Sequence, residues 1–414
     1  MAINKINQMP PKGIPVITDL DMLPFPDREG LEFEKLAKMN DPKNFNVINP
    51  FNIGTISMSR SCQYNCTFCF HPTGSKYRRR SKDIVLKEVD YLIAQFGIRQ
   101  LWFFDEMFAS KSNIHELFEL CDELVKRRVY WCAEMRVDDV DMNILRKMKD
   151  SNCVGLLFGV ESAVNKILKS MRKNTTIEQI ENAFHSCSIL DLPAIGFLIF
   201  GDLEDDKTTI RESANWKFRH PNYKILLQML STFPGSHDYN LACERGLIPD
   251  RTRYLKNGEF DINISKLSDV EYSELKAKIA VIDDFAKFPV DFDFDNIVPA
   301  KYKDILENLT LQGKVAVWPA TNNVMRLIEA IGWSNYTAHS DNVFFVNQNT
   351  ADIFTDRIRA QVNIYSPNII KEQNIETVVC LSKKQYVIDS VLAECSKKYS
   401  FVKKVLTLSD FIQG

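Results

Sequence analysis

Strand-length apolar segments alternate with helix-length amphipathic segments between residues 53 and 230, and this alternation limits the folds available to the chain. The apolar segments predict strands at 53–58, 100–104, 130–135, 154–160, 194–200 and 224–230. The intervening segments predict helices at 83–96, 113–126, 140–149, 176–190 and 207–218, with a further helix at 239–245. Strands joined by single helices form parallel sheets through crossover connections. The pattern therefore predicts an α/β fold, a partial (β/α)6 TIM-like barrel that remains open.

The remaining sequence divides into three further parts. Residues 1–50 are rich in proline and predict an extended N-terminal segment with one helix near 32–39. The barrel covers 51–245, and a charged helical connector follows over 246–311. Residues 312–414 predict a small Rossmann-like α/β domain. Its expected strands are 315–318, 343–346, 377–381 and 405–407, and its expected helices are 324–331 and 386–397.

Composition excludes several classes of protein. Lysine and arginine total 52 against 54 aspartates and glutamates, so the net charge of −2 provides no basic field for nucleic acid. The longest apolar run, residues 194–200, is far shorter than the roughly 18 residues that span a bilayer. The first residues contain no apolar run typical of a signal peptide. We therefore expect a cytoplasmic protein without nucleic-acid or membrane partners.

Three of the ten cysteines lie within eight residues, directly after the first predicted strand. Cys62, Cys66 and Cys69 follow a Cys-x3-Cys-x2-Cys spacing, whereas the other seven are scattered singly. Clustered thiolates bind zinc or iron–sulfur clusters. A zinc site would need a fourth ligand, for which His71 is close enough in sequence. Three thiolates on a four-iron cluster would instead leave one iron open, at the end of a barrel where chemistry is usually placed.

This spacing, with the aromatic Phe68 before the third cysteine, resembles the signature of radical S-adenosylmethionine (SAM) enzymes. The resemblance covers about residues 50–245. It implies a [4Fe–4S] cluster on the three cysteines, whose open iron chelates SAM. It also implies that a flavodoxin or ferredoxin-type donor reduces the cluster, and that SAM is cleaved to a 5′-deoxyadenosyl radical. That radical abstracts hydrogen from a substrate.

Further motifs of the family lie at the ends of the later strands. The Asp105-Glu106 pair after the second strand resembles the element that binds the SAM amino group, with either carboxylate able to serve. Glu161 and Ser162 end the fourth strand, where the family contacts the ribose and methionine. The resemblance implies cofactor contacts for Phe68, Asp105, Glu106, Arg136, Glu161, Ser162, Arg172 and Gly196. Arg172 resembles the basic residue that pairs with the SAM carboxylate, Arg136 is a second candidate for that region, and Gly196 resembles the glycine beside the adenine.

Other features carry less weight. The basic run at residues 77–80 predicts either a contact with an acidic substrate or, more simply, a solvated loop before a helix. The scattered cysteines predict small apolar core residues. The loop from Pro319 to Asn323 lacks the glycines with which Rossmann domains approach phosphates, so we expect substrate positioning or docking there.

The segment Leu23-Pro-Phe-Pro-Asp-Arg28 resembles the cobalamin-associated and methylthiotransferase-like branch of the family. Only 61 residues precede Cys62, too few for that branch's cobalamin domain, so cobalamin would have to come from a partner chain. We expect a radical SAM enzyme acting on a small or carrier-linked polar substrate, with a sugar as one candidate. The alternatives are a cobalamin-dependent methyltransferase and a non-catalytic iron–sulfur or zinc protein.

Overall fold

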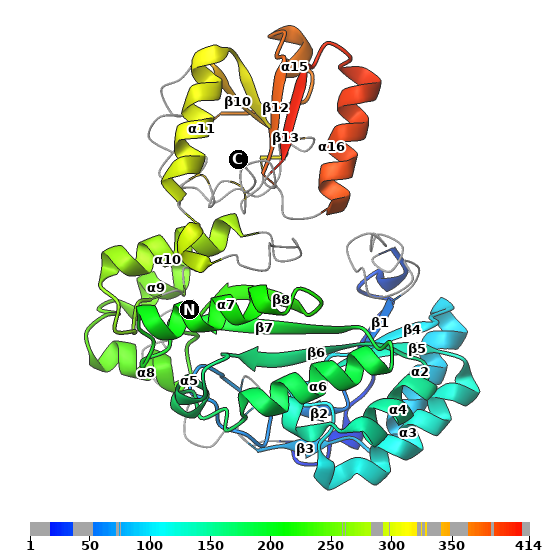
Figure 1. Cartoon of the computed structure of the whole chain (residues 1–414). Helices are drawn as coiled ribbons and strands as arrows, with labels where there is room; N and C mark the ends of the chain where they lie inside the picture. The colour runs from blue at the N-terminus through cyan, green and yellow to red at the C-terminus, as the bar shows by residue number, and fades with distance from the viewer. Residues whose placement is uncertain are drawn as a thin grey trace. The chain divides into compact units, whose positions relative to one another are not determined.

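The computed structural model describes residues 17–35, 53–71, 74, 76–258, 260, 262–282, 293–297, 299–320, 324, 328, 341–347, 363–381 and 385–407. The chain divides into two compact units, Met1–Lys266 and Leu267–Gly414 (Figure 1). Their boundary falls inside the predicted connector. None of the described helices is long and apolar enough to cross a membrane.

The first unit is built on a six-stranded sheet in the order β1-β4-β5-β6-β7-β8, in which every neighbouring pair is parallel. The strands are β1 Ile53–Ile56, β4 Gln100–Phe103, β5 Tyr130–Met135, β6 Cys153–Glu161, β7 Ala194–Phe200 and β8 Lys224–Met229. Strands adjacent in this sheet are consecutive along the chain, except that a short antiparallel hairpin intervenes between β1 and β4. That hairpin, which the sequence did not predict, consists of β2 (Ser59–Arg60) and β3 (Arg78–Arg79). The predicted partial barrel is confirmed.

Helices follow the strands as predicted, with most boundaries within two residues. They are α2 Lys82–Phe96, α3 Ile114–Arg127, α4 Met142–Asp150, α6 Ile177–Ile189, α7 Lys207–Arg219 and α8 His237–Glu244. Side chains fix the starts of several: Thr176 and Asp206 each accept backbone N–H groups of the first turn. Figure 1 shows α2, α3, α4 and α6 along one side of the sheet. The short helices α5 (Asn165–Ser170) and α9 (Arg251–Asn257) were not predicted.

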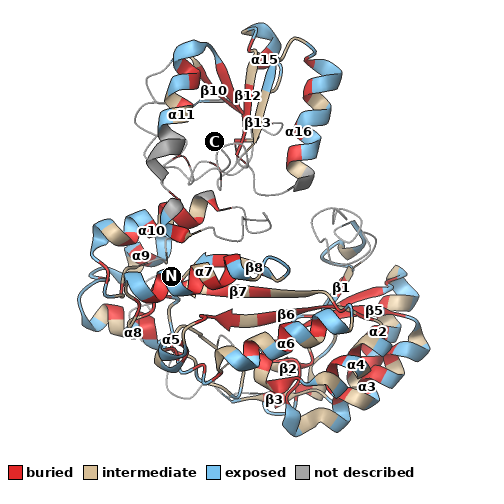
Figure 2. Cartoon of the chain, viewed as in Figure 1, coloured by how far each residue is buried: buried red, intermediate tan, exposed pale blue. Residues whose placement is uncertain are grey.

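Alternating burial shows that helices cover one face of this sheet. Phe158 in β6 is fully buried, and its ring lies 5.6 Å from that of Phe184 in α6. The intervening residues Leu157 and Phe197 are only half-buried and belong to the opposite face. Buried and less buried positions therefore alternate along β6 and β7 (Figure 2). Among the described residues, helices cover one face of this sheet, and the opposite face, called the open face here, carries the half-buried side chains.

The N-terminal element is fastened to the barrel by a shared carboxylate. Arg28 donates to Glu88 of α2 at 2.7 Å and to the carbonyl of Thr55 in β1 at 2.8 Å. Arg80 binds the second oxygen of Glu88, a side chain that is almost completely buried. The predicted helix near 32–39 is described only to residue 35.

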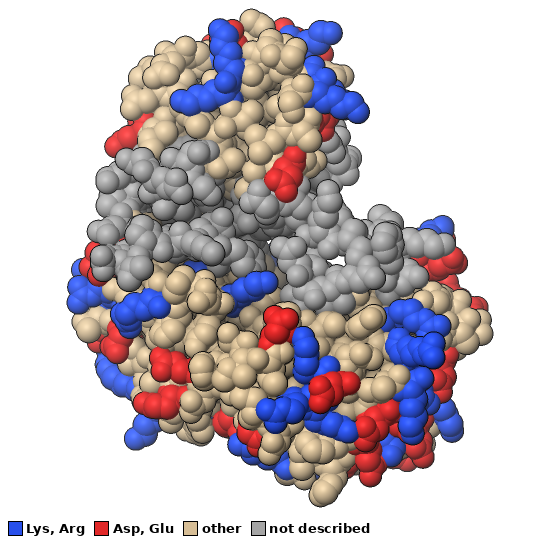
Figure 3. Space-filling view, turned by 45° about the vertical axis from the view of Figure 1, so that its right-hand side comes forward, with Lys and Arg blue, Asp and Glu red and all other residues tan. Residues whose placement is uncertain are grey.

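The basic run before α2 is therefore not a solvated loop, and that interpretation was wrong. Arg78 donates to the carbonyl of Ile17, and Arg79 donates to that of Phe108. With Arg80 bound to Glu88, each arginine of the run is used within the chain. On the face of the first unit seen in Figure 3, basic and acidic side chains are interspersed.

The second unit contains a five-stranded parallel sheet in the order β11-β10-β9-β12-β13. Its strands are β9 Val315–Val317, β10 Val343–Val346, β11 Ile364–Tyr365, β12 Thr377–Cys380 and β13 Lys404–Thr407. Its described helices include α10 Asp269–Val281, α11 Pro299–Gln312, α15 Ile369–Glu372 and α16 Gln385–Lys398. The chain winds outward from β9 in one direction and then in the other, as in doubly wound Rossmann-like domains, which confirms the predicted class.

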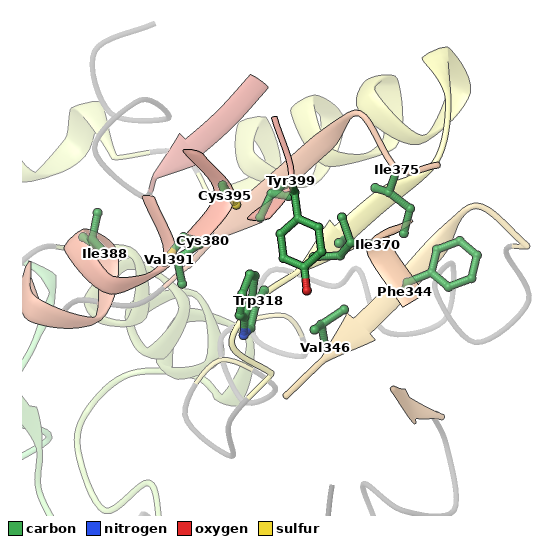
Figure 4. Packing of buried hydrophobic residues seen from close by; sticks show 12 residues of the cluster. Trp318, Phe344, Val346, Ile370, Ile375, Cys380, Ile388, Val391, Cys395 and Tyr399 are labelled. Carbon is green, nitrogen blue, oxygen red and sulfur yellow. The ribbon is translucent and has the colours of Figure 1, made fainter. Parts of the chain in front are cut away.

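The core of the second unit lies against this sheet (Figure 4). Trp318 and Tyr399 meet edge-on within it, with ring centroids 6.2 Å apart. Residues 321–323 of the glycine-free loop lie outside the described residues, as does most of the predicted helix 324–331. The proposed role of that loop stays a prediction.

Candidate functional site

The cysteine loop, defined here as residues Ser61 to His71, leaves β2 at the carboxyl ends of the barrel strands. Its backbone is held from two directions. Thr67 donates its N–H to the carbonyl of Met171 at 3.0 Å and accepts from the N–H of Asp238 at 3.1 Å. These bonds connect the loop to the segment after α5 and to the start of α8. They hold the backbone of the loop that carries the three cysteines.

Tyr64, between the first two cysteines, anchors the loop from a third side. Its hydroxyl donates to Asp139 at 3.0 Å, and the guanidinium of Arg136 lies 3.7 Å from the centre of its ring. Burial and the nearby carboxylate raise the pKa of Tyr64 to about 12, so the hydroxyl remains a donor. Arg136 also binds Asp138 through two nitrogens and the carbonyl of Lys173 at 2.7 Å. The predicted cofactor residue Arg136 is thus engaged in holding the loop.

Aromatic residues secure the far side of the cysteine loop. Phe68 is partly buried and packs against the apolar cluster around α5, α8 and α9. The ring of Phe70 lies 5.3 Å from that of Phe233, in the turn after β8. Phe68, predicted as a cofactor contact, contributes at least this packing.

The donor set suits an iron–sulfur cluster. Cys62, Cys66 and Cys69 are half-buried, whereas six of the other seven free cysteines are fully buried. Burial raises the pKa of all three thiols, that of Cys69 to about 12, while Lys173 lowers each of them. Among the described residues, no three His, Cys, Asp or Glu side chains converge closely enough for a single metal ion. Three thiols on one loop beside a buried cation fit a larger, anionic group.

His71, the possible fourth ligand of a zinc site, has a different partner. Its Nδ1 lies 2.7 Å from a carboxylate oxygen of Glu106, which follows β4. The predicted cofactor residue Glu106 therefore lies beside the cysteine loop, and about a quarter of its side chain is exposed.

The two neighbouring acids after β4 are clearly distinguished by the structure. Asp105 is buried, and one of its oxygens accepts from the backbone N–H of Ser59 at 2.5 Å and from its hydroxyl at 2.6 Å. Burial raises the pKa of Asp105 to about 6 despite these hydrogen bonds. Asp105 fastens the end of β4 to β2, so Glu106 is the better placed to reach a ligand.

A buried ion pair lies beside the cysteines. Glu161 ends β6 with a left-handed backbone, φ 61°, after a register shift between Gly159 and Glu161. Its Oε1 lies 2.7 Å from Nζ of Lys173, and both side chains are more than nine-tenths buried. A Cβ atom on Gly159 would lie 2.2 Å from that oxygen. The ion pair in this geometry therefore requires a residue without a side chain at position 159. The other carboxylate oxygen of Glu161 has no partner among the described residues.

Two further predicted residues, Arg172 and Ser162, are placed as follows. Arg172 is exposed, 3.4 Å from the ring of His237, and its carbonyl lies 4.0 Å from Sγ of Cys66. Ser162 is buried, bonds Ser213 at 3.0 Å and accepts from the N–H of Val164, so its hydroxyl is used inside the protein.

Gly196 does not face the open side of the sheet. A Cβ there would lie 2.7 to 2.8 Å from the side chains of Ile225, Val160 and Phe184 on the helix-covered face. Its small size serves the packing of β7 under α6, and the structure gives no support to a cofactor contact through this position.

Sequence reasoning missed Lys173 and Tyr64. The lysine directly follows the predicted Arg172, which was the only signal available, and its contact depends on the register shift that turns Glu161 toward it. Tyr64 lay within the cysteine motif, but its role requires Asp139 and Arg136 to be near it.

The fold and site define a class, a parallel α/β barrel with an open face and a loop of thiols at the carboxyl ends of its strands. Residues 56–216 match the family model described as the radical SAM superfamily. This part of the chain is a radical SAM domain, and the family uses a [4Fe–4S] cluster and SAM.

Curated relatives agree with this domain. An uncharacterized methyltransferase of Pyrococcus horikoshii is 24% identical over 246 residues, which is 59% of this chain and 51% of that protein. The anaerobic magnesium-protoporphyrin IX monomethyl ester cyclase of Rubrivivax gelatinosus is 31% identical over 176 residues, 41% of this chain and 29% of that one. The chain thus spans about half or less of the length of these relatives.

Solved structures resemble the chain more distantly. The cobalamin-dependent SAM radical enzyme OxsB, with aqua-cobalamin and SAM bound, is 13% identical with a TM-score of 0.48, over 87% of this chain and 57% of that one. The radical SAM methyltransferase TsrM from Kitasatospora setae, with cobalamin and a [4Fe–4S] cluster, is 18% identical with a TM-score of 0.43, over 50% and 43% of the two chains.

Proposed function

We propose that this protein is a radical SAM enzyme that removes a hydrogen atom from a small or carrier-linked polar substrate, with a sugar as one candidate. The observation that carries the proposal is the position of the cysteine loop. Within a radical SAM domain, Sγ of Cys66 lies 4.0 Å from the carbonyl of Arg172, and the charge of Lys173, the partner of Glu161, acts on all three thiols. When bound, the cluster and SAM supply a 5′-deoxyadenosyl radical.

Each residue has a defined part in this proposal. Cys62, Cys66 and Cys69 hold the cluster. The carbonyl of Arg172 lies near Cys66, and its exposed guanidinium, 3.4 Å from the ring of His237, can pair with the carboxylate of SAM. The unpartnered oxygen of Glu161 can accept hydroxyl groups of the ribose, and Glu106 can accept the amino group.

Two further points belong to the proposal. All ten cysteines are free, which suits a reducing cytoplasm and reduction by a flavodoxin or ferredoxin-type donor. Methyl transfer is the second candidate outcome, because the Pyrococcus relative is named a methyltransferase. In that case cobalamin from a partner chain would be a further requirement.

Anaerobic purification and reconstitution test the proposal directly. The protein should contain about four irons, as three thiolates and an open iron require, and lose them when all three cysteines become alanine. With a reductant it should convert SAM to 5′-deoxyadenosine. Glu161→Ala and Arg172→Ala should weaken SAM binding with iron retained, whereas Glu119→Gln on α3 should change neither property. Stoichiometric zinc without iron would contradict the proposal.

A further inference from the structure

The open face of the barrel carries an acidic side chain that has no partner. Glu134 in β5 is half-buried and makes no side-chain hydrogen bond or ion pair with any described residue. Its neighbours in the strand, Ala133 and Met135, are buried toward the helices, so Glu134 belongs to the opposite face. A partly buried carboxylate without a counter-charge is costly unless something else supplies one.

Aromatic and apolar side chains surround Glu134 on this face. On one side, Glu134 is paired in register with Leu157 of β6. On the other side, Phe103 of β4 is paired with Ala133. The next residue along each segment follows the same register, so Phe104 lies beside Glu134. Phe104 is 63% exposed although it is a large apolar residue, and its ring packs edge-on to that of Trp102 at 5.8 Å. On the side of β6, the half-buried Phe197 is paired with Gly159. The face offers flat apolar surfaces on both sides of one carboxylate.

Charges near the proposed reaction centre also act on Glu134. Burial raises the pKa of Glu134, the carboxylates of Asp105 and Glu161 raise it further, and Lys173 lowers it. The same Lys173 acts on all three thiols of the cysteine loop. Of the groups that act on Glu134, Lys173 is the cation and is already paired with Glu161, whereas Asp105 and Glu161 are carboxyl groups and supply no counter-charge.

We propose that Glu134, with Phe104 and Trp102, binds the substrate, and that the substrate carries a protonated amine next to a flat ring. An ammonium group would supply the counter-charge that the protein lacks, and a cation next to Trp102 gains a further attraction to the ring. The inference deepens the proposed function and rests on it, because it takes this open face to be the substrate side of the reaction.

A pair of probes of equal shape tests the charge requirement. Phenethylamine and 2-phenylethanol share a ring and a two-carbon arm, but only the amine is cationic. Equilibrium dialysis of the anaerobically reconstituted protein in weakly alkaline buffer should show the amine bound about tenfold more tightly, as one charge-assisted contact predicts. Glu134→Gln keeps the shape and the hydrogen-bonding oxygen, and it should bring the two affinities to within about twofold.

Two other variants locate the binding. Phe104→Ala removes an exposed ring that the fold does not need, and it should weaken both probes by a similar factor while keeping the preference for the amine. Glu119→Gln, the same change of charge on α3, should alter neither probe. Equal binding of the alcohol and the amine would overturn the inference in favour of a neutral hydroxylated ring. A preference that survives Glu134→Gln, or binding indifferent to Phe104→Ala, would overturn it as well.

The inference and the proposed function fail in distinguishable ways. Equilibrium dialysis measures binding of the probes to the open face, and it does so whether or not the protein cleaves SAM. Formation of 5′-deoxyadenosine measures SAM cleavage and needs neither probe. If Glu134→Gln weakens SAM binding as strongly as Glu161→Ala does, Glu134 serves SAM and the substrate assignment is wrong.

Discussion

The two sheets of this protein are both parallel, yet their strands are buried differently. In the first unit, β7 alternates between half-buried and buried residues, whereas in the second unit every residue of β9 and β10 is buried. Strand order explains the contrast. A sheet wound in one direction has its crossover helices on one face, and a sheet that reverses direction has helices on both. The open face of the first sheet is therefore available for chemistry, and the second sheet is mainly core.

The largest expected effect compares one phenylalanine from each sheet. Phe345 in β10 is 2% exposed, and Phe345→Ala should lower the free energy of unfolding by about 4 kcal/mol. Phe197 in β7 is half-buried on the open face, and Phe197→Ala should cost about 1 to 2 kcal/mol. Denaturant titrations followed by circular dichroism measure both. Equal losses would show that the open face is covered in the folded protein.

The buried ion pair at the edge of the open face should give the next largest effect. Lys173→Met leaves Glu161 charged and unpaired, at a cost of about 3 kcal/mol in the free energy of unfolding. Replacing both partners, Glu161→Gln with Lys173→Met, should recover part of that loss, because no charge is then stranded. Thermal unfolding of the single and double variants gives the comparison. If the double variant is the less stable, the pair contributes net stability.

A third prediction concerns Asp105, which fastens the end of β4 to β2. Its pKa is about 6 in the folded protein and close to 3.8 when unfolded, so between these values the folded state holds a proton that the unfolded chain has lost. Stability from this group is therefore complete at low pH and is lost as pH rises toward 6. The loss amounts to about 2 to 3 kcal/mol.

Asp205 also has a pKa raised to about 6, so it should contribute to the same loss of stability. The free energy of unfolding, measured between about pH 3 and pH 7, should fall less steeply with rising pH in Asp105→Asn than in the unmodified protein. It should fall still less steeply in the double variant with Asp205→Asn. An unchanged slope in the single variant would mean that Asp105 is ionised throughout.

The smallest effect compares two glycines on opposite faces of the first sheet. At Gly196, a Cβ would enter packed side chains of the helix-covered face, so Gly196→Ala should cost about 1 to 2 kcal/mol and leave SAM binding intact. At Gly159, the Cβ would meet the flexible ends of Glu161 and Lys173, so Gly159→Ala should cost less stability. That variant should weaken SAM binding instead. Unfolding and SAM titration on both proteins separate packing from binding.

The sequence predicted the six strands of the first sheet closely because their alternation with amphipathic helices is a local property. It missed β2, β3, β11, α5, α9 and α15, which are too short to show periodicity. It also missed α11, although Pro299 suits the first turn of a helix.

The site was less predictable than the fold. The thiols could be found from their spacing alone. The choice between Asp105 and Glu106 needed Ser59, which reaches Asp105 only when the hairpin forms. The contact between Glu161 and Lys173 depends on a register shift in β6, and no residue type in the sequence predicts that shift. Gly196 was assigned to a ligand because a glycine motif does not reveal which face of its strand is covered.

The bonds at Thr67 and Tyr64 bear on how the protein would mature. In zinc-finger peptides the metal organises an unfolded chain, so binding and folding are one event. Here the segment between the first and third cysteines is held by the rest of the domain, through the backbone of Thr67 to Met171 and Asp238 and through the side chain of Tyr64 to Asp139. None of these three bonds involves a thiol, so a cluster delivered to this chain would meet a loop whose main anchors are independent of the cluster's ligands.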